Sequence, residues 1–134
     1  MTSERDVAEC IAALWRLGPG GERTLFDAGG IVDQALEAIA PQLPAVVREQ
    51  LSFYKGLVNR RCSQWPTMVA WLEETGMAER DGTTFTKLRV TLSREQADEL
   101  LFSQSFTACQ RQNLPVTFYK AVQHCEAEAL ASPR

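Results

Sequence analysis

A helix pattern that ends at Gly76 and passes directly into a β-hairpin pattern constrains this chain most. Apolar side chains recur at helical spacing up to Leu72, and Gly76 is a natural helix terminator. Asp81-Gly82 is typical of a tight hairpin turn, and the segments on both sides of it have strand character. In the second segment, apolar residues alternate onto one face: Leu88, Val90 and Leu92. We therefore predict a helix that ends at Gly76, followed by one hairpin.

The remaining chain carries helical patterns. Ser3 is the expected N-cap of a first helix over residues 4–17, and Val32, Leu36 and Ile39 mark a second one. Residues 45–59 are apolar on much of a helical surface and are expected to form the central helix of the core. The capping box that begins at Ser93 predicts a helix over 94–110. A last helix is expected from Asn113-Leu114-Pro115 to about residue 131.

The segment before Gly76 has its own expected boundaries. Residues 59–62 are interpreted as a connector, Ser63 as the N-cap of the next helix, and Pro66 as part of its first turn. These elements predict a mainly α fold with one β-hairpin, a winged-helix-like helical domain. Residues 45–92 would form its helix-turn-helix and wing.

Length and composition favour a single globular domain over 1–134. The chain has 134 residues, 45% of them hydrophobic and 23% charged, so it can bury a core without disulfide or metal staples. No apolar run is long enough to span a bilayer. The polar N-terminus lacks the pattern of a signal peptide, so a cytoplasmic protein with no membrane partner is expected.

Charge is distributed unevenly along the chain. Residues 48–94 hold eight basic and five acidic side chains, whereas the segments on both sides are net acidic and the whole chain carries −3. A basic centre is where an anionic partner would dock, although ordinary scatter of charge produces the same modest excess.

Neither a metal site nor an active site is predicted. The four cysteines lie far apart and are interpreted as small buried residues: Cys10, Cys62, Cys109 and Cys125. Cys10 is expected to be inert because Glu9 lies beside it. His124 is the single histidine, and no catalytic set accompanies it at recognisable spacing. We expect no catalytic residues, no metal and no cofactor, hence no enzyme.

Two short sequence motifs of the central segment resemble those of MarR-type winged-helix transcriptional regulators. The sequence VAWLEETGMAER over Val69–Arg80 is similar to the end of their recognition helix and their first wing strand. The sequence RVTLS over Arg89–Ser93 is similar to their second wing strand. The resemblance covers about residues 45–100. It implies a DNA-binding regulator that acts as a homodimer, with helices 4–17 and 94–131 as the candidate dimerisation region.

Residues for DNA contact follow from the predicted elements. On the wing, Arg80, Lys87 and Arg89 suit phosphate contacts, and a solvated strand face is the alternative. In the connector, Arg60 and Arg61 suit the same role, with a solvated loop as the alternative. The recognition helix would read base edges through two further residues, Gln64 and Thr67.

Two aromatic residues favour a different partner. Trp71 lies off the main apolar stripe of its helix, which is unusual for a helix inserted into DNA, and Phe85 lies on the solvent side of the wing. Both suit anchors for another protein. The sequence thus leaves two hypotheses. One is a homodimeric DNA-binding regulator, and the alternative is a non-enzymatic protein–protein interaction adaptor or accessory factor of a secretion, phage or plasmid system.

Overall fold

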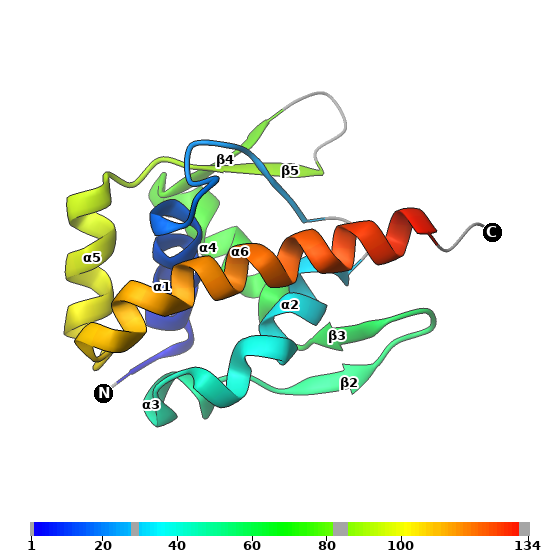
Figure 1. Ribbon diagram of the computed structural model, residues 1–134, viewed down its shortest axis with the longest axis horizontal. Coiled ribbons are helices and arrows are strands. Elements are labelled where there is room, and N and C mark those ends of the chain that lie inside the picture. Colours follow the sequence, from blue (N-terminus) through cyan, green and yellow to red (C-terminus); the bar gives the residue numbers. More distant parts are fainter. Residues whose placement is uncertain (1, 28–29, 82–85, 132–134) are drawn as a thin grey trace.

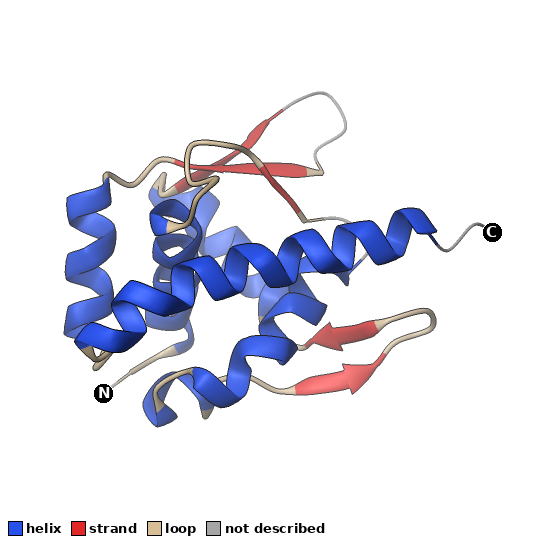
Figure 2. Cartoon of the chain, in the orientation of Figure 1, coloured by secondary structure: helices blue, strands red, loops and turns tan. Residues whose placement is uncertain are grey.

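The computed structural model describes residues 2–27, 30–81 and 86–131 (Figure 1). The helices are α1 (Glu4–Leu17), α2 (Ile31–Ile39), the 3-10 turn η2 (Ala40–Gln42), α3 (Ala45–Arg48), α4 (Trp65–Thr75), α5 (Arg94–Ser103) and α6 (Ala108–Ala131). The strands are β1 (Leu25–Phe26), β2 (Phe53–Lys55), β3 (Arg60–Cys62), β4 (Ala78–Asp81) and β5 (Lys87–Val90). The fold is mainly helical with two small antiparallel sheets (Figure 2).

Helix α1 is the centre of the core. Its N-terminus is closed by the expected Ser3 cap, in a capping box with Asp6. Every residue from Cys10 to Trp15 is buried, because α1 packs against α4, α5 and α6 of its own chain. Helix α6 crosses in front of α1 in Figure 1 and also covers α2. The central helix is therefore α1, and not the segment 45–59 that the sequence pattern favoured.

The expected helix over 45–59 is wrong. Helix α3 ends at Arg48, and the chain then forms a hairpin in which β2 pairs with β3 in antiparallel register. At its tip, the Gly56 N–H donates to the Asn59 carbonyl at 2.9 Å, and a Cβ at Gly56 would lie 2.7 Å from that oxygen. The connector expected at 59–62 is therefore largely strand β3. The chain has a second hairpin, and a strand rather than a helix precedes α4.

The strand pairing expected after Gly76 is confirmed, whereas Gly82 of the expected Asp81-Gly82 turn lies outside the described residues. Gly76 ends α4 with a φ of 76°, which a glycine adopts without strain, and β4 pairs with β5. Leu88 and Val90 are buried while Lys87 and Arg89 are exposed, as the alternation predicts. Strand β1 adds to the free edge of β5, which gives the order β1-β5-β4.

The boundary between the two C-terminal helices lies earlier in the chain than expected. The Ser93 capping box begins α5 as predicted, but α5 ends at Ser103 instead of continuing to 110. Helix α6 begins at Ala108 rather than 113, because Thr107 and Gln110 exchange backbone-to-side-chain hydrogen bonds at 2.8 and 3.1 Å as a further capping box. Pro115 consequently lies inside the helix.

Among the residues that the structure describes, no helix combines the length and apolar character needed to cross a bilayer.

Candidate functional site

Two arginines expected to contact DNA fasten the β2–β3 hairpin to helix α2. The Arg60 guanidinium donates hydrogen bonds to the Glu37 carboxylate, one of them at 2.8 Å. These hydrogen bonds raise the pKa of Arg60 above its usual value. Arg61 Nη1 lies 3.8 Å from Asp33 Oδ1. Both arginines therefore extend from a strand, not from a loop, and each already faces a carboxylate of its own chain.

The arginines of the second sheet are also paired. Arg80 contacts Asp27 at 3.0 Å and Glu73 at 3.1 Å, and Arg89 forms a close ion pair with Glu79. Burial raises the pKa of Asp27, although the Arg80 guanidinium opposes that shift. Lys87 is exposed on β5, with no ion pair to any part of the chain that the structure describes.

Helix α4 presents little that suits a DNA groove. Gln64 does not face solvent freely: its side-chain oxygen accepts the Ser52 N–H at 2.8 Å and its amide donates to the Ser52 hydroxyl at 2.8 Å. Gln64 is also the N-cap residue, so the expected cap at Ser63 is wrong. Thr67 is exposed as expected. The exposed face of α4 has no basic side chain and consists of Pro66, Thr67, Ala70, Glu73, Glu74 and Thr75.

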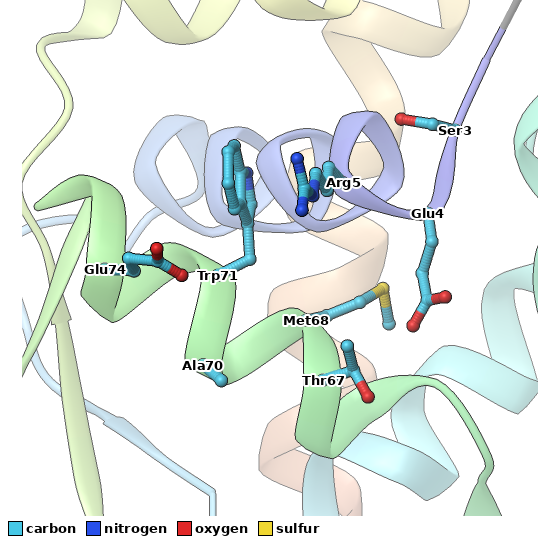
Figure 3. Close-up of a pocket in the computed structure, with 8 residues that line it drawn as sticks. All are labelled: Ser3, Glu4, Arg5, Thr67, Met68, Ala70, Trp71 and Glu74. Atoms are coloured by element: carbon cyan, nitrogen blue, oxygen red, sulfur yellow. The ribbon is translucent and has the colours of Figure 1, made fainter.

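Trp71 is half-buried beside helix α1. Its indole N–H donates to the Glu9 carboxylate at 3.2 Å, and the Arg5 guanidinium carbon lies 4.3 Å from the ring centroid. Figure 3 shows Trp71 and Arg5 side by side above a groove between α1 and α4. This α1–α4 groove has a volume of about 600 Å³ and is lined by Ser3, Glu4, Arg5, Thr67, Met68, Ala70, Trp71 and Glu74. Phe85, the other expected partner anchor, lies outside the described residues.

Within the described part of residues 48–94, the most exposed large apolar side chains lie on the β2–β3 hairpin. Leu57 is fully exposed at the tip, Val58 is 60% exposed and Tyr54 is 51% exposed. We call these three residues the hairpin patch. Lys55 lies beside them, exposed and without an ion pair to the described parts of the chain. The helix interpretation of 45–59 hid this patch, although Gly56 and Asn59, on the two sides of Leu57-Val58, are residue types that turns favour.

A polar pocket lies where the two sheets approach α4. It has a volume of about 520 Å³ and its lining includes Asp27, Asp33, Arg61, Trp65 and Arg80. Asp33 is only 3% exposed; its Oδ2 accepts the Cys62 N–H at 2.8 Å, while its Oδ1 has no hydrogen-bond partner. The charges of this pocket pair with one another, and the contact from Asp33 holds strand β3 on helix α2.

The thiols and the histidine have the following surroundings. Burial raises the pKa of Cys10 to about 12, with Asp6 and Glu9 adding to the shift, so this thiol stays protonated at neutral pH. Burial also raises the pKa values of Cys62 and Cys125. Cys109 is exposed in the first turn of α6, so the expectation that all four cysteines are buried is wrong for this one. His124 pairs with Glu128 on the surface of α6. Within the described ranges, no three His, Cys, Asp or Glu side chains could together hold a metal ion.

No protein-family model, curated protein or solved structure matches this chain.

Proposed function

We propose that this chain is a non-enzymatic protein-interaction module built on a winged-helix-like scaffold. The scaffold is supported by element order: α4 leads through Gly76 into β4, and β1 and β4 lie on the two sides of β5. A helix followed by such a hairpin is the layout that the resemblance to MarR-type regulators implies. Residues 40–64 then form an insertion between α2 and α4.

The observation that carries the proposal is the hairpin patch. Leu57, Val58 and Tyr54 are apolar or aromatic, are more than half exposed, and lie on a hairpin that extends from the helical body in Figure 1. Scattered apolar residues are ordinary on a surface, but three within five positions on one projecting element mark an interaction site. An aromatic residue beside aliphatic ones is also the composition of binding hot spots.

Charge supports a protein partner over DNA. A helix that reads DNA lies among phosphates, yet the exposed face of α4 ends in Glu73 and Glu74 and holds no basic residue. Arg60, Arg61 and Arg89 are each engaged by a carboxylate. Phosphates would have to displace these carboxylates or accept their repulsion, which lowers the affinity for any duplex.

DNA binding by a homodimer stays the second candidate, and two lysines favour it. Lys55 and Lys87 are exposed on separate hairpins, and no ion pair holds either one within the described ranges. Exposed ion pairs contribute little to stability, so phosphate could compete for Arg60 and Arg89 as well. This candidate needs the two hairpins, rather than α4, to make the main contacts.

One pair of assays separates the candidates. Fluorescence anisotropy with a generic labelled duplex should show no binding even at about 20–50 mM salt, where phosphate contacts are strongest. Binding whose log affinity falls by about 0.9 per log unit of salt for each phosphate, and which is lost in Lys55→Glu and Lys87→Glu, would establish the DNA candidate instead.

Protein binding is tested with immobilised chain and an extract of the cells that produce it. The wild-type chain should retain a protein that the Leu57→Asp variant does not retain. Leu130→Asp is the matched control, because Leu130 is 88% exposed at the far end of α6. Identical retention by wild type and Leu57→Asp would refute a role for the hairpin patch.

A further inference from the structure

The β2–β3 hairpin is basic and apolar. Residues 50–72 contain Lys55, Arg60 and Arg61 but no Asp or Glu. The tip itself presents Leu57 and Val58 to solvent with Lys55 beside them. A surface that accommodates this tip must offer an apolar cleft with carboxylates at its edge.

The α1–α4 groove of the same chain has that character. Met68, Ala70 and Trp71 supply its apolar part, and Figure 3 shows the carboxylates of Glu4 and Glu74 at its two ends. Its volume of about 600 Å³ lies within the range of pockets that enclose small ligands, so two aliphatic side chains fit. The Arg5 guanidinium also lines the groove, over the Trp71 ring, so the groove matches the tip in polarity and, at its Glu4 and Glu74 ends, in charge.

We propose that the hairpin tip of one copy docks into the α1–α4 groove of a second copy. This inference rests on the proposed protein-binding function and names its partner as the chain itself. Leu57 and Val58 enter the groove beside Trp71, and Lys55 approaches Glu4 or Glu74. Because each copy contributes a different surface, the contact is heterologous and forms a closed ring or an open chain of copies.

The contact is small, so the association is weak. A hairpin tip in one groove buries less than the roughly 1,200–2,000 Å² of a standard interface, unless two such contacts close a dimer. Burial of one leucine changes a binding constant by about tenfold or more. The mass of the wild-type chain should therefore rise with concentration between about 10 and 500 µM, the range suited to a weak interface.

Sedimentation velocity over that range tests the proposal with two variants. Leu57→Asp places a charge on the tip, and Ala70→Lys places a bulky cation in the groove. Both positions are exposed, so the fold should persist, which circular dichroism checks. Each variant should weaken self-association at least about tenfold. The matched controls Leu130→Asp and Ala127→Lys, both on exposed positions of α6, should associate like wild type.

Mixing the two variants gives the decisive result. The Leu57→Asp chain retains an intact groove and the Ala70→Lys chain retains an intact tip, so the mixture should form a one-to-one complex at concentrations where neither variant alone associates appreciably. A wild-type chain that stays monomeric at the highest concentration overturns the proposal, and so does self-association that both variants retain. If the chain is monomeric but still retains another protein through Leu57, self-docking fails while the proposed function stands.

Discussion

Asp33 should decide whether the β2–β3 hairpin is held firmly on the helical body. Its carboxylate is 3% exposed, accepts the Cys62 N–H at 2.8 Å and faces the Arg61 guanidinium at 3.8 Å. Asp33→Ala removes both interactions and leaves the backbone donor of Cys62 without its acceptor. The hairpin would then lose its most buried polar attachment to α2.

The expected cost follows from these contacts. A hydrogen bond to a charged acceptor contributes about 1.5–3 kcal/mol, and an unsatisfied buried N–H costs about 1–3 kcal/mol. The two overlap, so we expect Asp33→Ala to lower the free energy of unfolding by about 3 kcal/mol. Asp33→Asn keeps an acceptor for Cys62 and loses only the charge, so its cost should be near 1 kcal/mol.

Urea unfolding measures both variants. With a slope of about 1–3 kcal/mol per molar urea, a loss of 3 kcal/mol moves the midpoint by about 1–3 M. Hydrogen exchange adds a local measurement, since the Cys62 amide should lose its protection in Asp33→Ala and retain most of it in Asp33→Asn. A midpoint for Asp33→Ala within the error of wild type would refute the reasoning, and so would equal costs for the two variants.

Three further outcomes are expected. Gly76→Ala should cost about 1 kcal/mol in urea unfolding, because φ is +76° there and no atom lies within 4 Å of the added Cβ, so backbone strain is the only cause; a cost of zero would contradict this. Arg80→Gln should raise the pKa of Asp27 further above its ordinary value, since the guanidinium lowers it, and an NMR titration of Asp27 that shows a lower pKa would be contrary evidence. The free energy of unfolding should fall as pH rises from about 9 toward 12. The reason is that the Cys10 thiol ionises in the unfolded chain at a lower pH than in the folded chain, where its pKa is about 12. Cys10→Ala should remove this part of the pH dependence, and an unchanged pH dependence in that variant would contradict the prediction.

Local signals predicted the elements that local interactions determine. The Ser3 and Ser93 caps fix the starts of α1 and α5, and the positive φ at Gly76 fixes the end of α4. Strand β5 could be predicted because its polar and apolar residues alternate, which matches one exposed and one buried face. In each case a few neighbouring residues contain the whole physical cause.

The segment 45–59 shows why the rest was not predictable. Val47, Tyr54 and Val58 have helical spacing, but that spacing indicates a common buried face only if one helix joins them. In the fold, Val47 is the buried residue of α3, whereas Tyr54 and Val58 face solvent on the β2–β3 hairpin. The core position that this segment was expected to fill belongs to α1, and no local pattern reports which of two apolar helices becomes central.

The basic centre of the sequence has a physical explanation that charge counting misses. On α2, Asp33 and Glu37 are one helical turn apart, and they receive Arg61 and Arg60 from strand β3. Arg80 in the same way joins β4 to Asp27 after β1 and to Glu73 on α4. Three of the eight positive charges of residues 48–94 thus fasten the inserted hairpin and the sheet to carboxylates of other elements. Such internal ion pairs must be subtracted before an uneven charge distribution is interpreted as evidence for an anionic partner. On the two hairpins, the subtraction leaves Lys55 and Lys87 as the exposed basic side chains without an ion pair to the described residues.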